Sequence, residues 1–178
     1  MQLPVFKAAR LHTALLLVLL PCAAQAKRAP NLSFKDLDGH PQKLAALHGS
    51  ISVVSFWATW CAPCREELPR LSQLAQQYAA QGVRFVAISI DEPKDRGKVA
   101  PYVTAQKLQM DVWLGGDTDM LARVGLGNIV PGTLILDRQG EIVGRIMGEA
   151  RDEDVQSRVD WLLHGRQGPA PEALTKRY

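Results

Sequence analysis

Two kinds of spacing between hydrophobic residues predict a chain of alternating strands and helices. Residues 51–56 form a compact β-rich run, and residues 83–90 are apolar on both sides, which is typical of a strand buried on both faces. Residues 67–80 carry apolar side chains near helical spacing until Gly82, and a second amphipathic helix is expected over 95–108. The centre of the chain therefore predicts strand, helix, strand, helix.

Turn signals place the shorter elements around this centre. Asp38-Gly39 predicts an entry hairpin within residues 32–42, and the turn at 137–140 predicts a second hairpin. The remaining expected elements are strands at 112–114, 133–136 and 141–147, a helix at 118–124 capped by Thr118, and a last helix at 152–163. This order favours an α/β fold with a central mixed sheet and helices on both faces.

The first 26 residues have the layout of an export signal. A basic start precedes an apolar run over 13–20, and small side chains follow up to Ala26. The run is shorter than the roughly 20 residues that cross a bilayer, so we expect cleavage after Ala26. Two alternatives stay open: a retained anchor over 11–26, and a lipoprotein signal at Cys22, although Pro21 departs from the small residue normally found before such a cysteine.

The remaining chain is expected to form one domain over 27–164 and a loose tail over 165–178, which contains two prolines. Hydrophobic residues make up 47% and charged residues 22%, as in soluble globular proteins. The net charge of +3 is too small and too evenly spread to indicate nucleic-acid binding. Removing residues 1–26 leaves 19 basic and 18 acidic residues, and leaves Cys61 and Cys64 as the only cysteines.

The Cys61-Ala62-Pro63-Cys64 motif carries the candidate chemistry. It lies where the predicted strand 51–56 leads into the following helix, and a helix N-terminus favours the thiolate form of cysteine. Pro63 is compatible with the first helical turn, which needs no N–H donor there. Cys61, at the exposed end, would attack a partner disulfide, and Cys64, one turn further, would resolve the mixed disulfide.

Other uses of the two cysteines are less favoured. A structural disulfide would close too short a loop to stabilise a fold much, and a structural zinc site needs four ligands. A Cu(I) carrier would use both thiolates, with Met147 or His40 approaching in space. Residues 91–93 are expected to form a plain turn after a strand. Thiol–disulfide exchange is the preferred interpretation.

The run SFWATWCAPCREELP at 55–69 resembles the active-site segment of the TlpA/ResA branch of the thioredoxin superfamily, which includes redoxin or AhpC/TSA-like domains. The resemblance extends over about 32–163 and includes the entry hairpin, the extra helix at 95–108 and the segment 130–133. It implies a thioredoxin fold with an N-terminal hairpin and one inserted helix. A peroxidase is the weaker alternative, because Cys61 lacks the Pro-x-x-x-Thr/Ser-x-x-Cys setting of that class.

The resemblance also implies roles for individual residues. Pro131 matches a proline that is cis in such proteins, and the backbone of Val130 would pair with an extended client segment. Trp60 would flank the docking surface and Trp57 would pack beneath it. Together with Ala62 and Pro63 of the motif, the residues expected to bind the client are Trp60, Val130 and Pro131.

Glu67 is the candidate proton carrier. It lies three residues after Cys64 on the same helix face, and a partly buried carboxyl group there could give or take a proton. A plain first-turn acid that suits the helix dipole is the alternative. Cytosolic thioredoxins carry an acid two residues before the first tryptophan of this run; here that residue is Ser55, which shifts any acid–base role toward Glu67.

The resemblance favours a periplasmic reductase over an oxidant that introduces disulfides. A membrane electron donor would re-reduce it, and its clients would be proteins with disulfides or dithiols, such as apocytochrome c or copper proteins. No cofactor besides the Cys61–Cys64 disulfide is expected. The Ala62-Pro63 dipeptide does not determine the direction of electron flow.

Overall fold

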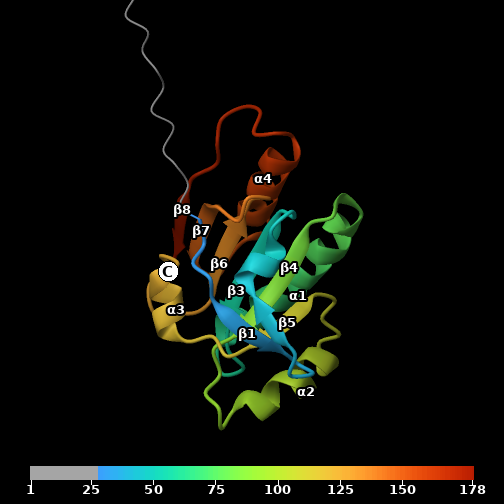
Figure 1. Cartoon of the computed structure of the whole chain (residues 1–178), viewed down its shortest axis with the longest axis vertical. Coiled ribbons are helices and arrows are strands. Elements are labelled where there is room, and N and C mark those ends of the chain that lie inside the picture. Colours follow the sequence, from blue (N-terminus) through green and yellow to red (C-terminus); the bar gives the residue numbers. More distant parts are fainter. Residues whose placement is uncertain (1–27) are drawn as a thin grey trace, which may run out of the picture.

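The computed structural model describes residues 28–178, in which eight strands form one mixed sheet (Figure 1). The predicted export signal at 1–26 lies outside the described residues, so its cleavage stays a prediction. The strands are β1 (Ser33–Asp36), β2 (Pro41–Lys43), β3 (Ser52–Trp57), β4 (Arg84–Ser89), β5 (Asp111–Leu114), β6 (Gly132–Leu136), β7 (Ile142–Gly148) and β8 (Leu174–Arg177). Their order in the sheet is β2-β1-β5-β4-β3-β6-β7-β8.

The centre of the sheet is parallel and its flanks are mixed. β3 pairs with β4, and β4 with β5, in parallel, whereas β6 runs antiparallel to β3. Both predicted hairpins are confirmed, since β1 pairs with β2 and β6 with β7 in antiparallel register. All six residues of β3 are buried, because helices and loops cover both faces of the sheet.

Helices cover the two faces unequally. The helices are α1 (Ala62–Tyr78), α2 (Val99–Ala105), α3 (Thr118–Arg123) and α4 (Asp152–Leu163), with short 3-10 turns η1 (Leu44–Leu47), η2 (Ala79–Gln81) and η3 (Arg96–Lys98). Apolar residues of α1, α2 and α4 pack on one face, and those of α3 and η1 pack on the other (Figure 1). Alternation along β3 follows this division: Val53 and Trp57 face α1, and Phe56 faces away from it. The predicted fold class is therefore confirmed.

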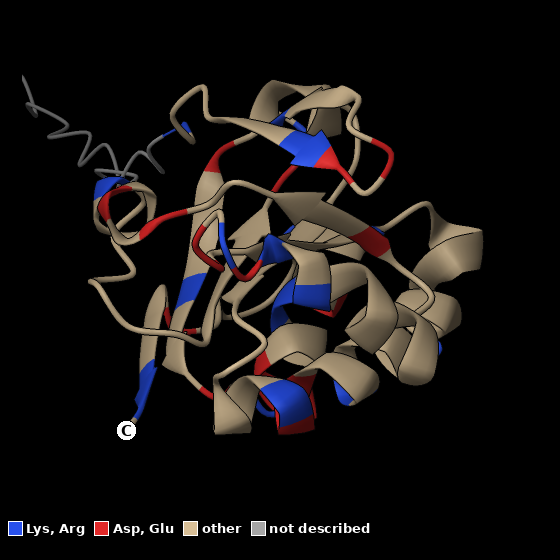
Figure 2. Ribbon diagram, turned by 90° about the horizontal axis from the view of Figure 1, so that it is seen from below, with Lys and Arg blue, Asp and Glu red and all other residues tan. Residues whose placement is uncertain are grey.

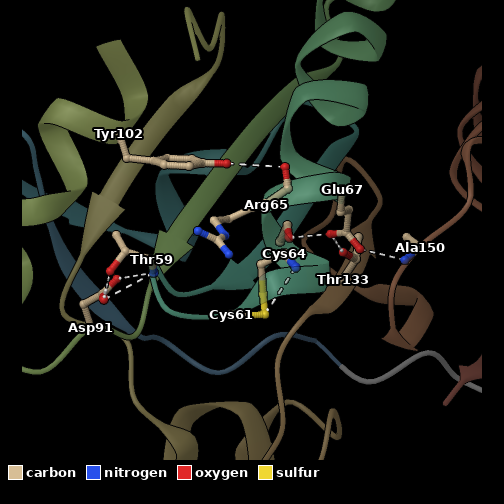
Figure 3. Close-up of a disulfide and its surroundings, with 10 residues drawn as sticks. Thr59, Cys61, Cys64, Arg65, Glu67, Asp91, Tyr102, Thr133 and Ala150 are labelled. Atoms are coloured by element: carbon tan, nitrogen blue, oxygen red, sulfur yellow. Dashed lines mark hydrogen bonds between the residues drawn. A yellow bond between two sulfur atoms is a disulfide. The ribbon is translucent and has the colours of Figure 1, made fainter. Parts of the chain in front are cut away.

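The inserted helix is shorter than predicted and supports α1. The segment expected as a helix at 95–108 consists of η3 followed by the seven residues of α2. Pro69 lies inside α1 and has no N–H to donate to the carbonyl of Arg65. The Tyr102 hydroxyl of α2 donates to that carbonyl at 3.4 Å instead (Figure 3). The centre of the Tyr102 ring lies 5.2 Å from that of Trp57.

The cap predicted for the helix at 118–124 is wrong by one residue. Asp117 is the N-cap of α3, because its carboxylate accepts a hydrogen bond of 2.7 Å from the backbone N–H of Met120. Thr118 is instead the first helical residue. Asp and Thr are both common N-cap residues, and a carboxylate also interacts favourably with the helix dipole. The sequence alone therefore does not distinguish Asp117 from Thr118 as the cap.

The prediction of a loose tail over 165–178 is wrong for residues 174–177. Residues 174–177 form β8, which pairs in parallel with β7 and extends the sheet. Side chains attach this strand to α4: Arg158 donates to Thr175 Oγ1 at 2.8 Å, and Arg177 forms an ion pair with Asp154 at 2.6 Å. The prolines lie before the strand, where they remove no ladder hydrogen bond.

Lys and Arg, and Asp and Glu, are both scattered over the ribbon (Figure 2). None of the helices within residues 28–178 combines the length and the apolar character that a membrane span requires.

Candidate active site

Cys61 and Cys64 form a disulfide at the N-terminus of α1 (Figure 3). Cys61 is the N-cap residue, and its Sγ accepts a hydrogen bond of 3.2 Å from the backbone N–H of Cys64. Both cysteines are buried, but Cys61 keeps 4% of its surface exposed and Cys64 keeps none, so Cys61 is the nearer of the two to solvent. The unpaired N–H groups and dipole of the helix N-terminus would stabilise a thiolate at Cys61.

Exposed residues surround the entrance to the disulfide. Trp60 is 64% exposed, whereas Trp57 is fully buried and packs beneath the motif, as predicted. Ala62 and Pro63 are exposed on the first turn of α1. An exposed aromatic ring beside a reactive sulfur can contact a client protein, so the client-binding role predicted for Trp60 remains open.

The peptide bond between Val130 and Pro131 is cis, as the resemblance implies. Pro131 is buried and Val130 is half-buried in the connection that leads into β6. The Pro131 carbonyl accepts a hydrogen bond of 2.9 Å from the backbone N–H of Gly148, at the end of β7. The start of β6 and the end of β7 are therefore joined beside the site.

Glu67 is fully buried in α1 and is held by three hydrogen bonds (Figure 3). Its Oε1 accepts from the hydroxyls of Ser55 at 2.8 Å and Thr133 at 3.3 Å, and its Oε2 accepts from the backbone N–H of Ala150 at 2.6 Å. Burial raises the pKa of Glu67 from 4.5 to about 7, although the hydrogen bonds and the charge of Arg70 act in the opposite direction. Glu67 is therefore not an exposed first-turn acid.

A second buried carboxylate anchors the segment before Cys61, and sequence reasoning missed it. Asp91 follows β4 and accepts from the backbone N–H of Thr59 at 3.0 Å and from its hydroxyl at 2.6 Å. The Ser89 hydroxyl also donates to this carboxylate, at 2.8 Å. The turn predicted at 91–93 thus also holds Thr59, in the segment before Cys61, in place (Figure 3). The parallel pairing of β3 with β4, which ends at Trp57 and Ser89, brings Asp91 to Thr59 across 32 residues of sequence.

Among residues 28–178, Asp36, Asp38 and His40 form a group whose ligand atoms lie close enough to hold a cation together. Neither cysteine belongs to that group. The Cu(I) alternative would bring His40 to the cysteines, whereas His40 lies 3.2 Å from the carboxylate of Asp36 in the β1–β2 hairpin.

A redox-active cysteine pair at a helix N-terminus, on a mixed sheet with helices on both faces, defines a thiol–disulfide oxidoreductase with the thioredoxin fold. The model of the AhpC/TSA family matches residues 26–145, and the chain belongs to this family, within which it is related to the ResA proteins.

Two curated relatives and one solved structure agree with this assignment. The thiol-disulfide oxidoreductase ResA of Bacillus anthracis is 31% identical over 130 residues, which cover 73% of each chain. The ResA protein of Geobacillus kaustophilus is 28% identical and covers 84% of this chain and 93% of its own. A thioredoxin-family thiol:disulfide interchange protein from Chlorobium tepidum TLS superposes with a TM-score of 0.66 at 29% identity, over 79% of this chain and 99% of its own. The predicted thioredoxin fold and enzyme class are therefore confirmed.

Proposed function

We propose that the protein is an exported reductase that transfers electrons from the Cys61–Cys64 dithiol to disulfides of client proteins, with Glu67 as the proton carrier. The observation that carries this proposal is the buried carboxyl group of Glu67 one helical turn after the buried Cys64. A resolving thiol without access to solvent needs a neighbouring group that takes its proton, and a carboxyl group that titrates near neutrality suits that task.

The cycle has two exchange steps. The Cys61 thiolate attacks one sulfur of the client disulfide, the client S–S bond breaks, and the second client sulfur leaves as a thiolate that takes a proton from water. Cys64 then gives its proton to the Glu67 carboxylate, directly or through one water, and its thiolate attacks Cys61 Sγ. The mixed disulfide breaks and its client sulfur leaves as a thiolate that takes up the proton held by Glu67. The client thus gains two electrons and two protons, while the protein ends with the Cys61–Cys64 disulfide and an ionised Glu67. An external donor of two electrons and two protons restores the dithiol.

Client binding would use the surface around the disulfide. The exposed ring of Trp60 and the first turn of α1 at Ala62 and Pro63 offer side-chain contacts. The backbone of Val130, before cis Pro131, would pair with an extended client segment by strand addition. Proteins whose cysteines must be reduced before they receive haem or copper are suitable clients, and a membrane protein is the proposed electron donor.

The reduction potential of Cys61–Cys64 tests the direction of electron flow. Residues 27–178 would be equilibrated in defined thiol buffers and followed by tryptophan fluorescence. We expect a potential of about −250 mV or lower, in the range of proteins that reduce their clients. A potential of about −120 mV would make the protein an oxidant and contradict the proposal.

Export is tested separately by mass spectrometry of the protein recovered from a cell that makes the full chain. Cleavage after Ala26 would leave an N-terminus at Lys27 in the exported fraction. A full-length mass would identify a retained anchor, and a lipid-modified Cys22 would identify a lipoprotein. Either result contradicts cleavage after Ala26 without affecting the redox chemistry.

A further inference from the structure

The side chain of Arg70 joins α1 to the connection between β7 and α4. Arg70 lies three residues after Glu67, on the next turn of α1. One guanidinium nitrogen donates to the carbonyl of Ala150 at 3.0 Å and to Asp152 at 2.9 Å, and the other donates to Glu149 at 2.6 Å. Three acceptors on one short segment therefore share a single planar group, a geometry for which a guanidinium is suited and an ammonium is not.

The segment that Arg70 holds also contacts both halves of the site. The backbone N–H of Ala150 donates to Glu67 Oε2 at 2.6 Å, which is the shortest hydrogen bond to that carboxylate. Two residues earlier, the N–H of Gly148 donates to the carbonyl of cis Pro131 at 2.9 Å. The Ala150 residue is thus held on both sides, because Arg70 binds its carbonyl and Glu67 binds its N–H.

We propose that Arg70 is a positioning residue for Glu67, holding the 149–152 connection so that the Ala150 N–H and a nearby positive charge face the carboxylate. This inference rests on the proposed proton-carrier role of Glu67. Arg70, a half-buried and ion-paired residue of α1, thereby takes part in the second exchange step.

Arg70 supplies the charge that opposes the effect of burial on Glu67, in addition to holding the segment that contains Ala150. The strands β3 and β6 contribute only the Ser55 and Thr133 hydroxyls to the carboxylate. The charged group that acts on it is Arg70, which is itself paired with Glu149 and Asp152 of the connection. In the reduced protein the Cys64 thiol lies one turn earlier on α1. Loss of Arg70 would remove the positive charge, leave the carboxylates of Glu149 and Asp152 without their ion pairs, and release the Ala150 carbonyl, so that the segment whose N–H donates to Glu67 is held less firmly. Each change disfavours ionised Glu67.

The test is a pH titration of the Glu67 carboxyl group by carbon NMR in the oxidised full-length protein, with E67Q to assign the resonance. We expect a midpoint near 7 in the parent protein, and a midpoint about one pH unit higher in R70M. The lysine variant R70K keeps the charge but cannot bridge three acceptors, so its midpoint should fall between the two. R70K also serves as the measurable variant if R70M does not fold.

Arg84 supplies a matched control. It is 36% exposed against 32% for Arg70, and it likewise donates to a carbonyl, that of Ala46 at 3.1 Å, and to a carboxylate, that of Asp111 at 2.6 Å. R84M removes an equivalent ion pair at the β4–β5 end of the sheet and should leave the Glu67 midpoint unchanged. An equal shift in R84M, or no shift in R70M and R70K, would overturn the inference.

Kinetics show whether the effect acts through Glu67. The probe is a synthetic peptide with one internal disulfide, reduced by the dithiol protein under single-turnover conditions between pH 5 and 9. At pH 7, R70M should resolve the mixed disulfide about five-fold more slowly, since an upward shift of one unit reduces the ionised fraction from about one half to one tenth. In the E67Q background, R70M should cause no further change. A pH profile that E67Q leaves unaltered would refute the proton-carrier role as well, whereas a normal E67Q effect with an additive R70M effect would refute only the role of Arg70.

Discussion

The hydroxyl of Ser55 lies 2.8 Å from Oε1 of Glu67, so this hydrogen bond joins β3 to α1. Ser55 stands two residues before Trp57 in β3. Both side chains are buried, and Ser55 occupies the strand position at which cytosolic thioredoxins carry an acid. A hydroxyl there donates to the carboxylate, whereas a second acid would compete with it for protons. The buried carboxyl group beside Cys64 therefore lies on α1 rather than on β3.

Removing the Ser55 hydroxyl is expected to raise the pKa of Glu67 further. The hydrogen bond favours the ionised form, and a bond worth about 1 kcal/mol corresponds to a shift of somewhat under one pH unit in S55A. The carbon NMR titration of Glu67 measures it. Ser52 is an equally buried serine of β3 whose hydroxyl donates only to the Ser50 carbonyl at 3.5 Å, so S52A should leave the titration unchanged. An unchanged midpoint in S55A would show that this hydrogen bond does not control Glu67.

The raised pKa of Glu67 should make folding stability fall as the pH rises. Between its ordinary value of 4.5 and about 7, the unfolded chain releases the proton while the folded protein keeps it. The unfolded state then binds fewer protons, so the free energy of unfolding decreases over this interval, by about 3 kcal/mol in total. The stabilising contribution of Glu67 is fully present below pH 4.5 and is lost once the pH has risen through about 7.

Urea unfolding of the oxidised parent protein and of E67Q at several pH values measures this loss. The difference between the two stabilities should decline by that amount from about pH 4.5 to about pH 7.5, since glutamine does not titrate. A constant difference would mean that Glu67 ionises normally in the folded state.

The parts of the site that could be predicted lie close together in the sequence. The motif from Trp60 to Glu67 is contiguous, so helical spacing alone places Glu67 one turn after Cys64. Arg70 and Asp91 could not be assigned in this way, because their partners lie 82 and 32 residues away, respectively. A half-buried arginine or a turn aspartate has no spacing signal of its own. The strand β8 escaped for a similar reason: its LTKR sequence has no apolar alternation, and its pairing with β7 supplies the order.

The hydrogen bond from Thr59 to Asp91 is expected to stabilise the segment before Cys61. T59V removes the hydroxyl that lies 2.6 Å from a buried carboxylate while preserving the side-chain shape. Because the acceptor is charged, we expect a loss of about 1.5–3 kcal/mol in the free energy of unfolding. Thr118 is exposed and is not a cap, so T118V should change stability by less than about 0.5 kcal/mol. Equal effects of the two substitutions would show that the Thr59–Asp91 hydrogen bond does not stabilise the segment.

The C-terminal strand is expected to be required for stability. Deleting 165–178 removes the ladder between β7 and β8 and leaves Arg158 and Asp154, both buried in α4, without Thr175 and Arg177. Breaking buried ionic contacts from one side costs about 3–5 kcal/mol, which thermal and urea unfolding would detect. Deletion of the exposed Tyr178 alone is the control and should change little. A truncated protein as stable as the parent would show that residues 165–178 do not contribute to stability, as a loose tail would not.

Trp60 is expected to contribute to client binding and not to folding. Its ring is 64% exposed, so W60A should change the free energy of unfolding by less than about 0.5 kcal/mol. A protein client that covers this ring would lose a large contact area, and we expect its KM to rise about ten-fold. Reduction of the Cys61–Cys64 disulfide by dithiothreitol, which is too small to cover the ring, should keep its rate. L37A removes another exposed apolar side chain, 39% exposed on the β1–β2 turn, and should leave both reactions unchanged. If W60A slowed dithiothreitol exchange as much as client reduction, Trp60 would act on the reactivity of Cys61 and the docking role would be wrong.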